Sequence, residues 1–149
     1  MKLPFFHKKN ESIVRRLLTA KAVGLFFGLI CFFSIPIFWP NETLMFRFGI
    51  LIWYTVLGLI IGISGVLSHH PYLKFKFPIG FRGFFFGALL SFVFVLLGYE
   101  KLEELMFTTQ NFSDWGLFSP FWFVLEGLLL GTIIDIIATK VGGEGKQIL

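Results

Sequence analysis

Four long apolar runs, separated by short segments that hold most of the charges, dominate the pattern of the chain. The runs cover approximately residues 22–39, 48–68, 79–99 and 117–138. Each is close to the roughly 20 residues that a helix needs to cross a hydrocarbon core about 30 Å thick. Because backbone polar groups must be paired inside lipid, each run is predicted to be helical. The pattern therefore predicts an all-α integral membrane protein, a four-transmembrane-helix bundle in which residues 1–149 form a single membrane domain.

Proline residues mark several ends of these runs. Pro40 follows the first run and Pro78 stands at the beginning of the third. Ser119 and Pro120 fit the N-cap and the first position of the fourth helix. Pro36 lies inside the first run, where the missing backbone N–H predicts a kink.

The composition excludes a water-soluble fold. The chain is 56% hydrophobic and 15% charged, with a mean hydropathy of +0.80, and it contains 22 Phe residues. A soluble core of this size could not enclose so many large side chains, so many of them are expected to face lipid. Cys31 is the only cysteine, which excludes an intramolecular disulfide and a cysteine-rich metal site.

The basic residues predict the topology. Eleven of the 13 lie in the N-terminal segment 1–21, in the stretch from the end of the second run to Arg82, or in the tail 139–149. By the positive-inside rule, these three segments are cytoplasmic, so both termini face the cytoplasm of a plasma (inner) membrane. This basic face is expected to contact anionic lipid headgroups, and no nucleic-acid-binding surface is indicated. A cleaved signal peptide is the alternative interpretation of the first run, but no A-x-A-like site follows it.

The two halves of the chain share a pattern that suggests two tandem helical hairpins related by an internal parallel repeat. Between the second and fourth runs, three residues match at an offset of 69 positions: Trp53 with Trp122, Gly58 with Gly127, and Gly62 with Gly131. Between the first and third runs, Gly24 and Gly28 match Gly83 and Gly87 at an offset of 59. Chance matching is the alternative, because Gly, Trp and Phe are frequent. The segment Glu100–Met106 either extends the third helix or lies at the membrane surface.

Every run contains two glycines four residues apart. Small residues at this spacing allow helix backbones to approach closely in lipid, within one chain or between copies. The pairs are Gly24/Gly28, Gly58/Gly62, Gly83/Gly87 and Gly127/Gly131. They favour a non-enzymatic protein that acts through helix-helix contacts, as a homo-oligomer or as a small subunit of a membrane complex.

Glu126 is the most informative single residue. It lies about nine residues from the start of the fourth run, or ~13 Å along a helix, and so near the middle of the membrane. An acidic residue at that depth costs ~2.5–3.5 kcal/mol, so it should face the bundle interior or a wet cavity. Either it is a proton or cation site in a small channel or transporter, or it is a satisfied group hydrogen-bonded to a neighbouring helix.

Three further charges lie near the cytoplasmic ends of the runs. Asp135 lies about one turn inside the fourth run, at a depth similar to that of Arg82 and close to that of Lys21. We expect Asp135 to pair with Arg82 or Lys21 and to fix the register of the fourth helix, a structural role rather than a catalytic one.

No motif indicates an enzyme, a cofactor or a metal site. Adjacent His69 and His70 cannot both face one ion from a regular helix, and no H-E-x-x-H or C-x-x-C accompanies them. A nucleophile elbow, a P-loop and a dinucleotide fingerprint are all missing from the sequence. A membrane enzyme that acts on lipid headgroups is the weakest hypothesis, because too few polar residues could converge at the interface.

Overall fold

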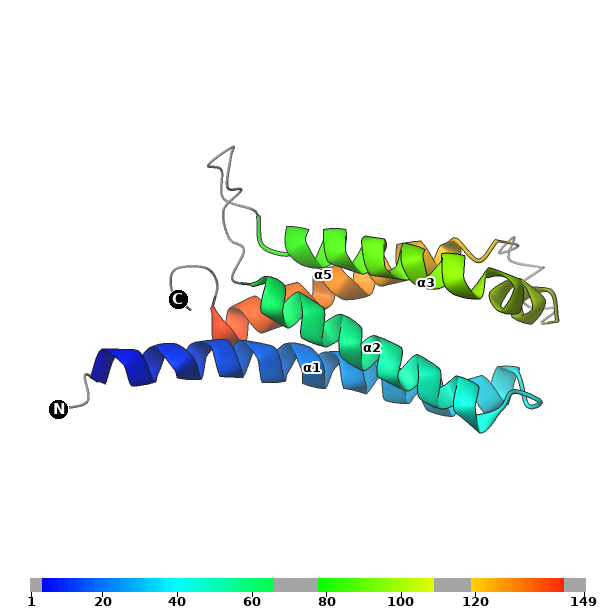
Figure 1. Cartoon of the computed structure of the whole chain (residues 1–149), viewed down its shortest axis with the longest axis horizontal. Helices are drawn as coiled ribbons and strands as arrows, with labels where there is room; N and C mark the ends of the chain where they lie inside the picture. Colours follow the sequence, from blue (N-terminus) through cyan, green and yellow to red (C-terminus); the bar gives the residue numbers. More distant parts are fainter. Residues whose placement is uncertain (1–3, 66–77, 109–118, 144–149) are drawn as a thin grey trace.

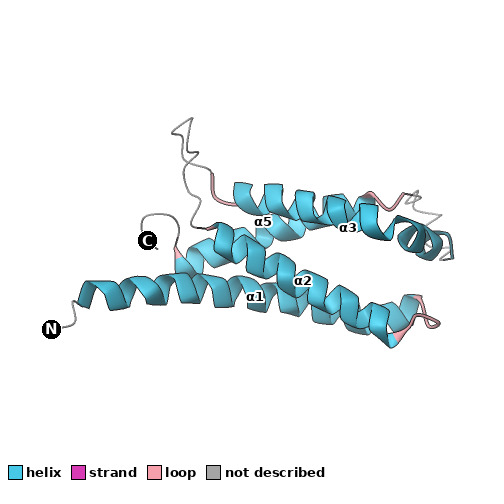
Figure 2. Ribbon diagram, viewed as in Figure 1, coloured by secondary structure: helices cyan, strands magenta, loops and turns pink. Residues whose placement is uncertain are grey.

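The computed structural model describes residues 4–65, 78–108 and 119–143, with side chains from Ser12 onward. In these residues the chain forms four helices packed as a bundle (Figures 1 and 2): α1 (Pro4–Phe38), α2 (Leu44–Ser64), α3 (Phe81–Thr108) and α5 (Trp122–Gly142). Each contains a segment long and apolar enough to cross a membrane. The prediction of an all-α multi-pass membrane protein built as a four-helix bundle is confirmed.

The helices form two hairpins. α1 packs along α2, α3 packs along α5, and the hairpins meet chiefly where α1 lies against α5 (Figure 1). The start of α1 and the end of α5 lie together, since the Ser12 hydroxyl donates a hydrogen bond to the Gly142 carbonyl. The end of α2 and the start of α3 lie at this end too, joined by the Arg82 guanidinium and the Gly65 carbonyl. We call it the arginine end, after the buried Arg16 and Arg82.

The helices differ from the predicted spans at their ends. α1 begins at Pro4, so part of the predicted N-terminal segment 1–21 is helical, and it continues two residues past Pro36. α5 begins at Trp122 instead of residue 117. Its first turn is tighter than an α-helix, with the Trp122 amide donating to the Ser119 carbonyl at 3.2 Å, and the Ser119 hydroxyl accepts the Phe121 amide at 3.4 Å.

A kink inside α3 was not predicted. Gly98 has non-helical dihedral angles (φ −113°, ψ 18°), and the helix continues to Thr108 beyond it. The segment 99–108 therefore extends the third helix in a new direction and packs back on the bundle, with Leu102 and Leu105 buried. Of the two alternatives for Glu100–Met106, extension of the helix is the one observed.

The large exposed side chains of the bundle are those expected of a surface in lipid. Phe33 and Leu97 are 66% and 85% exposed, whereas Leu57, Ile61 and Ile134 are fully or almost fully buried between the helices. A water-soluble bundle would place its large apolar groups inside. The exposed apolar surface, together with four candidate spans, implies contact with a lipid bilayer.

Glycine allows the helices of each hairpin to touch through their backbones. A Cβ atom on Gly58 of α2 would lie closer than 3.0 Å to the carbonyl oxygen of Ala20 in α1. In the second hairpin, a Cβ atom on Gly131 of α5 would meet the carbonyl oxygen of Gly83 in α3 in the same way. Real Cβ atoms essentially never come this close, so these positions accept only glycine without a shift of the backbone.

The contacts align the two hairpins differently from the sequence matches. Gly24 lies against Gly58 in the first hairpin, and Gly87 lies against Gly131 in the second. These pairs correspond at offsets of 63 and 73 residues, one helical turn away from the offsets of 59 and 69 in the sequence matches. The internal repeat stays a prediction. When the hairpins are aligned by their glycine contacts, each residue of the first half corresponds to a residue of the second half that lies one helical turn later than the sequence matches place it.

Candidate functional site

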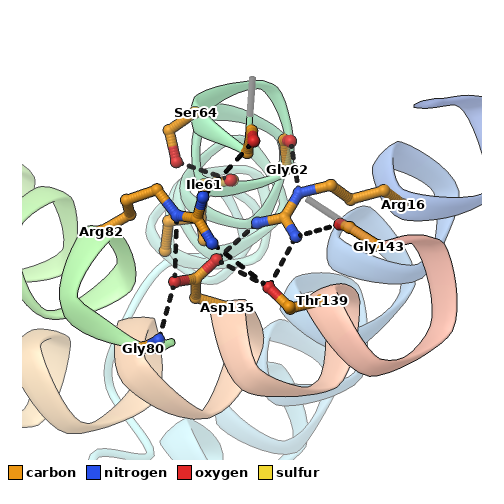
Figure 3. Close-up of polar contacts among 10 residues, drawn as sticks. Arg16, Ile61, Gly62, Ser64, Gly80, Arg82, Asp135, Thr139 and Gly143 are labelled. Atoms are coloured by element: carbon orange, nitrogen blue, oxygen red, sulfur yellow. Dashed lines mark hydrogen bonds and ion pairs between the residues drawn. The ribbon is translucent and has the colours of Figure 1, made fainter. Parts of the chain in front are cut away.

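A cluster of buried charges lies at the arginine end (Figure 3). Asp135 of α5 is fully buried and forms ion pairs with Arg16 of α1 and Arg82 of α3, whose exposures are 1% and 2%. Arg16 Nη2 pairs with Asp135 Oδ1, and Arg82 Nε lies 3.5 Å from Oδ2. The Gly80 amide donates a hydrogen bond to Oδ2 at 3.1 Å. One carboxylate thus joins three helices.

The guanidinium groups also bind the end of α2. Arg16 Nε donates to the Gly62 carbonyl at 3.1 Å, and Arg82 Nη1 donates to the Gly65 carbonyl at 3.4 Å. The last carbonyls of a helix have no partner within the helix, so buried donors must supply one. Arg16 Nη1 donates to the Thr139 hydroxyl at 2.7 Å as well. The cluster therefore connects all four helices, and its contacts indicate a structural role.

The structure brings together some of the predicted residues and adds one. Asp135 and Arg82 are in contact, whereas Lys21, the alternative partner, is exposed and has no hydrogen bond or ion pair within the described residues. Arg16 was counted only among the topology-determining charges. The sequence could have predicted that Arg16 faces α2, because it lies four residues before Ala20, in line with the small residues of α1 that face α2. A charge in line with a small-residue stripe faces the neighbouring helix and not lipid.

A cavity of about 210 Å³ lies between the two hairpins, in the half of the bundle away from the arginine end. All four helices contribute to its wall, which is mainly apolar and aromatic. The lining residues include Cys31, Phe38, Trp39, Phe46, Trp53, Tyr54, Ser91, Phe94, Leu102, Leu105, Phe123 and Glu126. None of the residues that line it is Lys, Arg or His.

Glu126 supplies the carboxyl group that lines this cavity. Its Oε1 accepts a hydrogen bond of 2.5 Å from the hydroxyl of Tyr54, which is 7% exposed on α2. Within the described residues, Glu126 has no ion pair and no other side-chain hydrogen bond. Because α5 begins at Trp122, Glu126 lies four residues, or about 6 Å, inside the helix. It is thus hydrogen-bonded to a neighbouring helix and borders a cavity, whereas its role as a proton or cation site stays a prediction.

The segment 99–108 closes the cavity at the end opposite the arginine end. Leu102 and Leu105 line the wall, and Trp39 Nε1 donates a hydrogen bond of 2.8 Å to the Leu105 carbonyl. Lys101 Nζ lies 2.8 Å from Glu42 Oε1 in the connection between α1 and α2. Lys101 is 42% exposed, and ion pairs so accessible contribute about 0–1 kcal/mol. The accessible ion pair of this closure thus contrasts with the fully buried charges at the arginine end.

The aromatic wall includes a stacked pair that bridges the hairpins. The rings of Trp53 on α2 and Phe94 on α3 lie 4.7 Å apart with an interplanar angle of 27°. Offset stacks of this kind contribute about 0.5–1.5 kcal/mol beyond the burial of their area. Trp53 is matched with Trp122 in the sequence, yet that match did not indicate that Trp53 would border a cavity.

The structure offers no metal site among the residues it describes. No three His, Cys, Asp or Glu side chains gather closely enough to hold an ion in 12–65, 78–108 and 119–143. His69 and His70 lie outside the described residues. No family model, curated protein or solved structure matches the chain, so its function must be argued from the geometry.

Proposed function

We propose that the protein is a small transporter that binds a mainly apolar solute in the cavity between its hairpins, with Glu126 as the polar anchor. One observation carries this proposal: a cavity built from all four helices has a carboxyl group in an otherwise largely apolar and aromatic wall. Binding sites for small molecules generally combine an apolar wall with a few placed polar groups. The sequence motivated a helix-contact protein more strongly, but its glycine pairs are in contact within the hairpins.

The cavity volume limits the size of the solute. An engineered cavity of roughly 150 Å³ is large enough for benzene. At about 210 Å³, this cavity accommodates one aromatic ring with a small substituent. Larger solutes would require the wall to move.

The unequal ends of the bundle indicate the side on which a solute would enter the cavity. At the arginine end, Asp135 and two arginines connect all four helices through buried contacts. At the other end, the described residues contribute the hydrogen bond between Trp39 and Leu105, a partly exposed ion pair and the segment that follows Gly98. Hinges are a few residues that absorb a change of dihedral angle. Opening at this end would expose the cavity for entry of the solute, and release on the other side would require a second rearrangement at the arginine end.

Uptake into proteoliposomes tests the proposal. Ring-sized solutes that do not cross lipid unaided are supplied in three charge states: phenyltrimethylammonium, benzenesulfonate and zwitterionic phenylglycine. We expect the protein to take up at least one of them faster than protein-free liposomes. Ile50→Trp, which fills the cavity wall, should abolish uptake, whereas Ile63→Trp on the 57% exposed surface of the same helix should not. Failure to take up any of the three would contradict the proposal.

The proposed orientation places the arginine end in the cytoplasm, in agreement with the basic residues of the sequence. Reporter fusions to the two termini test it, and we expect both reporters to be active on the cytoplasmic side. Opposite locations of the two termini would contradict an even number of spans.

Assembly with other copies or with a larger membrane complex stays a prediction of the sequence. Since Gly24, Gly58, Gly87 and Gly131 face partners within the chain, an assembly would use other residues. Mass measurement in mild detergent tests it, and a strictly monomeric protein without a co-purifying partner would contradict it.

A further inference from the structure

We infer that the cavity selects an organic cation, with Glu126 as its counter-ion and the aromatic wall as its cage. This inference rests on the proposed function, because it names the class of solute for the same site. It is carried by the environment of the carboxyl group, by the residues around it, and by a contrast with Asp135, the fully buried carboxyl group of α5.

Among the described residues, Glu126 is the only acidic one that lines the cavity, and no basic one lines it. The Tyr54 hydroxyl occupies Oε1, while Oε2 has no hydrogen-bond partner in the described part of the chain. A carboxylate in an apolar setting is strongly destabilised unless a cation or donors compensate it. Oε2 is therefore available to a positively charged group that arrives with the solute.

The aromatic residues give a cation further contacts. Trp53, Tyr54, Phe94 and Phe123 border the same cavity as Glu126. A ring face attracts a cation by about 0.5–1 kcal/mol at exposed sites and about 2 kcal/mol or more when desolvated, and quaternary ammonium groups are bound by such aromatic cages. An anionic solute would gain nothing from these ring faces and would be repelled by Glu126.

The surroundings of Asp135 contrast with those of Glu126, which has no counter-ion among the residues that the structure describes. Both residues lie on α5, about 13 Å apart along the helix. Asp135 is surrounded by Arg16 and Arg82, the Gly80 amide and the Thr139 hydroxyl. Glu126 has one tyrosine and an open cavity wall. The chain thus compensates the buried carboxylate of Asp135 with its own cations and leaves the half-buried Glu126 for a ligand.

Two probes of the same shape test the charge directly. Phenyltrimethylammonium and tert-butylbenzene differ in having N⁺ or C at the centre of the substituent, and each is one ring with a small group, as the cavity volume requires. Binding is followed in lipid nanodiscs through the ¹⁵N-indole resonance of Trp53, with protein-free nanodiscs as the baseline for partitioning. We expect the cation to bind about thirtyfold more tightly than the neutral probe, the ratio that the ~2 kcal/mol of a close charge pair with Glu126 corresponds to.

Two variants assign the preference to Glu126. Glu126→Gln keeps the shape and an oxygen for Tyr54, so it should bind the neutral probe as before and lose most of the preference for the cation. Retained binding of the neutral probe also shows that this variant is folded. Glu104→Gln, a control 66% exposed on α3 and outside the cavity, should keep the full preference.

The possible outcomes separate this inference from the proposed function. Equal binding of the two probes, or uptake of benzenesulfonate or phenylglycine in place of phenyltrimethylammonium, would overturn the selection of a cation. The cavity would still be a binding site. A preference for the cation that persists in Glu126→Gln would overturn the role of Glu126. If neither probe binds, the inference and the proposed function both fail.

Discussion

Replacing Gly58 by alanine tests whether the hairpins depend on backbone contact. A Cβ atom there would overlap the Ala20 carbonyl oxygen and approach Gly24 Cα to 3.2 Å, and backbone atoms cannot move aside as a flexible side chain can. The matched control is Gly49→Ala in the same helix, because a Cβ atom on Gly49 would have nothing within 4 Å. The two variants make the same chemical change in α2 and differ in what the added methyl group meets.

The expected difference follows from two opposing terms. Exchange of glycine for alanine favours the helix by about 0.8–1.0 kcal/mol in either variant, so this term cancels between them. Overpacking a close contact costs about 1–3 kcal/mol and applies only to Gly58→Ala. We therefore expect Gly49→Ala to be neutral or stabilising, and Gly58→Ala to be less stable than Gly49→Ala by about 1–3 kcal/mol.

Unfolding by SDS titration from bicelles, followed by circular dichroism, measures both variants against the unmodified protein. A difference below about 0.5 kcal/mol would refute the reasoning, because it would mean that α1 and α2 separate at little cost or do not touch at Gly58.

Three further predictions concern the two ends of the bundle. Asp135→Asn should lower the free energy of unfolding by about 3–5 kcal/mol, since it removes the carboxylate that contacts both arginines. Lys101→Ala should lower it by less than about 1 kcal/mol. Equal losses in the same SDS titration would contradict this difference. The double variant Arg82→Asp with Asp135→Arg should stay less stable than the unmodified protein, because an arginine at position 135 would face Arg16. Full recovery of stability in this variant would show that Arg16 is not part of the cluster. Trp39→Phe removes the indole donor to the Leu105 carbonyl, so the closure should loosen and Cys31, the only cysteine, should react faster with a water-soluble thiol reagent; an unchanged labelling rate would argue against opening at this end.

The spans could be predicted because their signal is local. Any stretch of about 20 apolar residues must become helical in lipid, whatever surrounds it. The glycine spacing likewise indicated close packing, although it could not indicate which helix would be the partner. The structure pairs Gly58 with α1 and Gly131 with α3, so both stripes are used inside the hairpins.

The candidate site could be predicted only in part, because partners depend on how helices rotate and bend. Glu126 was identifiable from its isolation in an apolar run, but Tyr54, its hydrogen-bond donor, lies 72 residues earlier on another helix. The bend at Gly98 is not marked by a proline in the sequence. Without that bend, Leu102 and Leu105 would not close the cavity.

By itself, the sequence determined that the chain lies in lipid, that it crosses as four helices, and that a carboxyl group is carried into the apolar region. Those properties follow from hydropathy, which each segment possesses independently of the rest. Only the tertiary structure decided that Arg16 joins Asp135 at one end and that Glu126 borders a cavity toward the other. Such neighbours are set by packing between helices, which brings together residues that no local pattern relates.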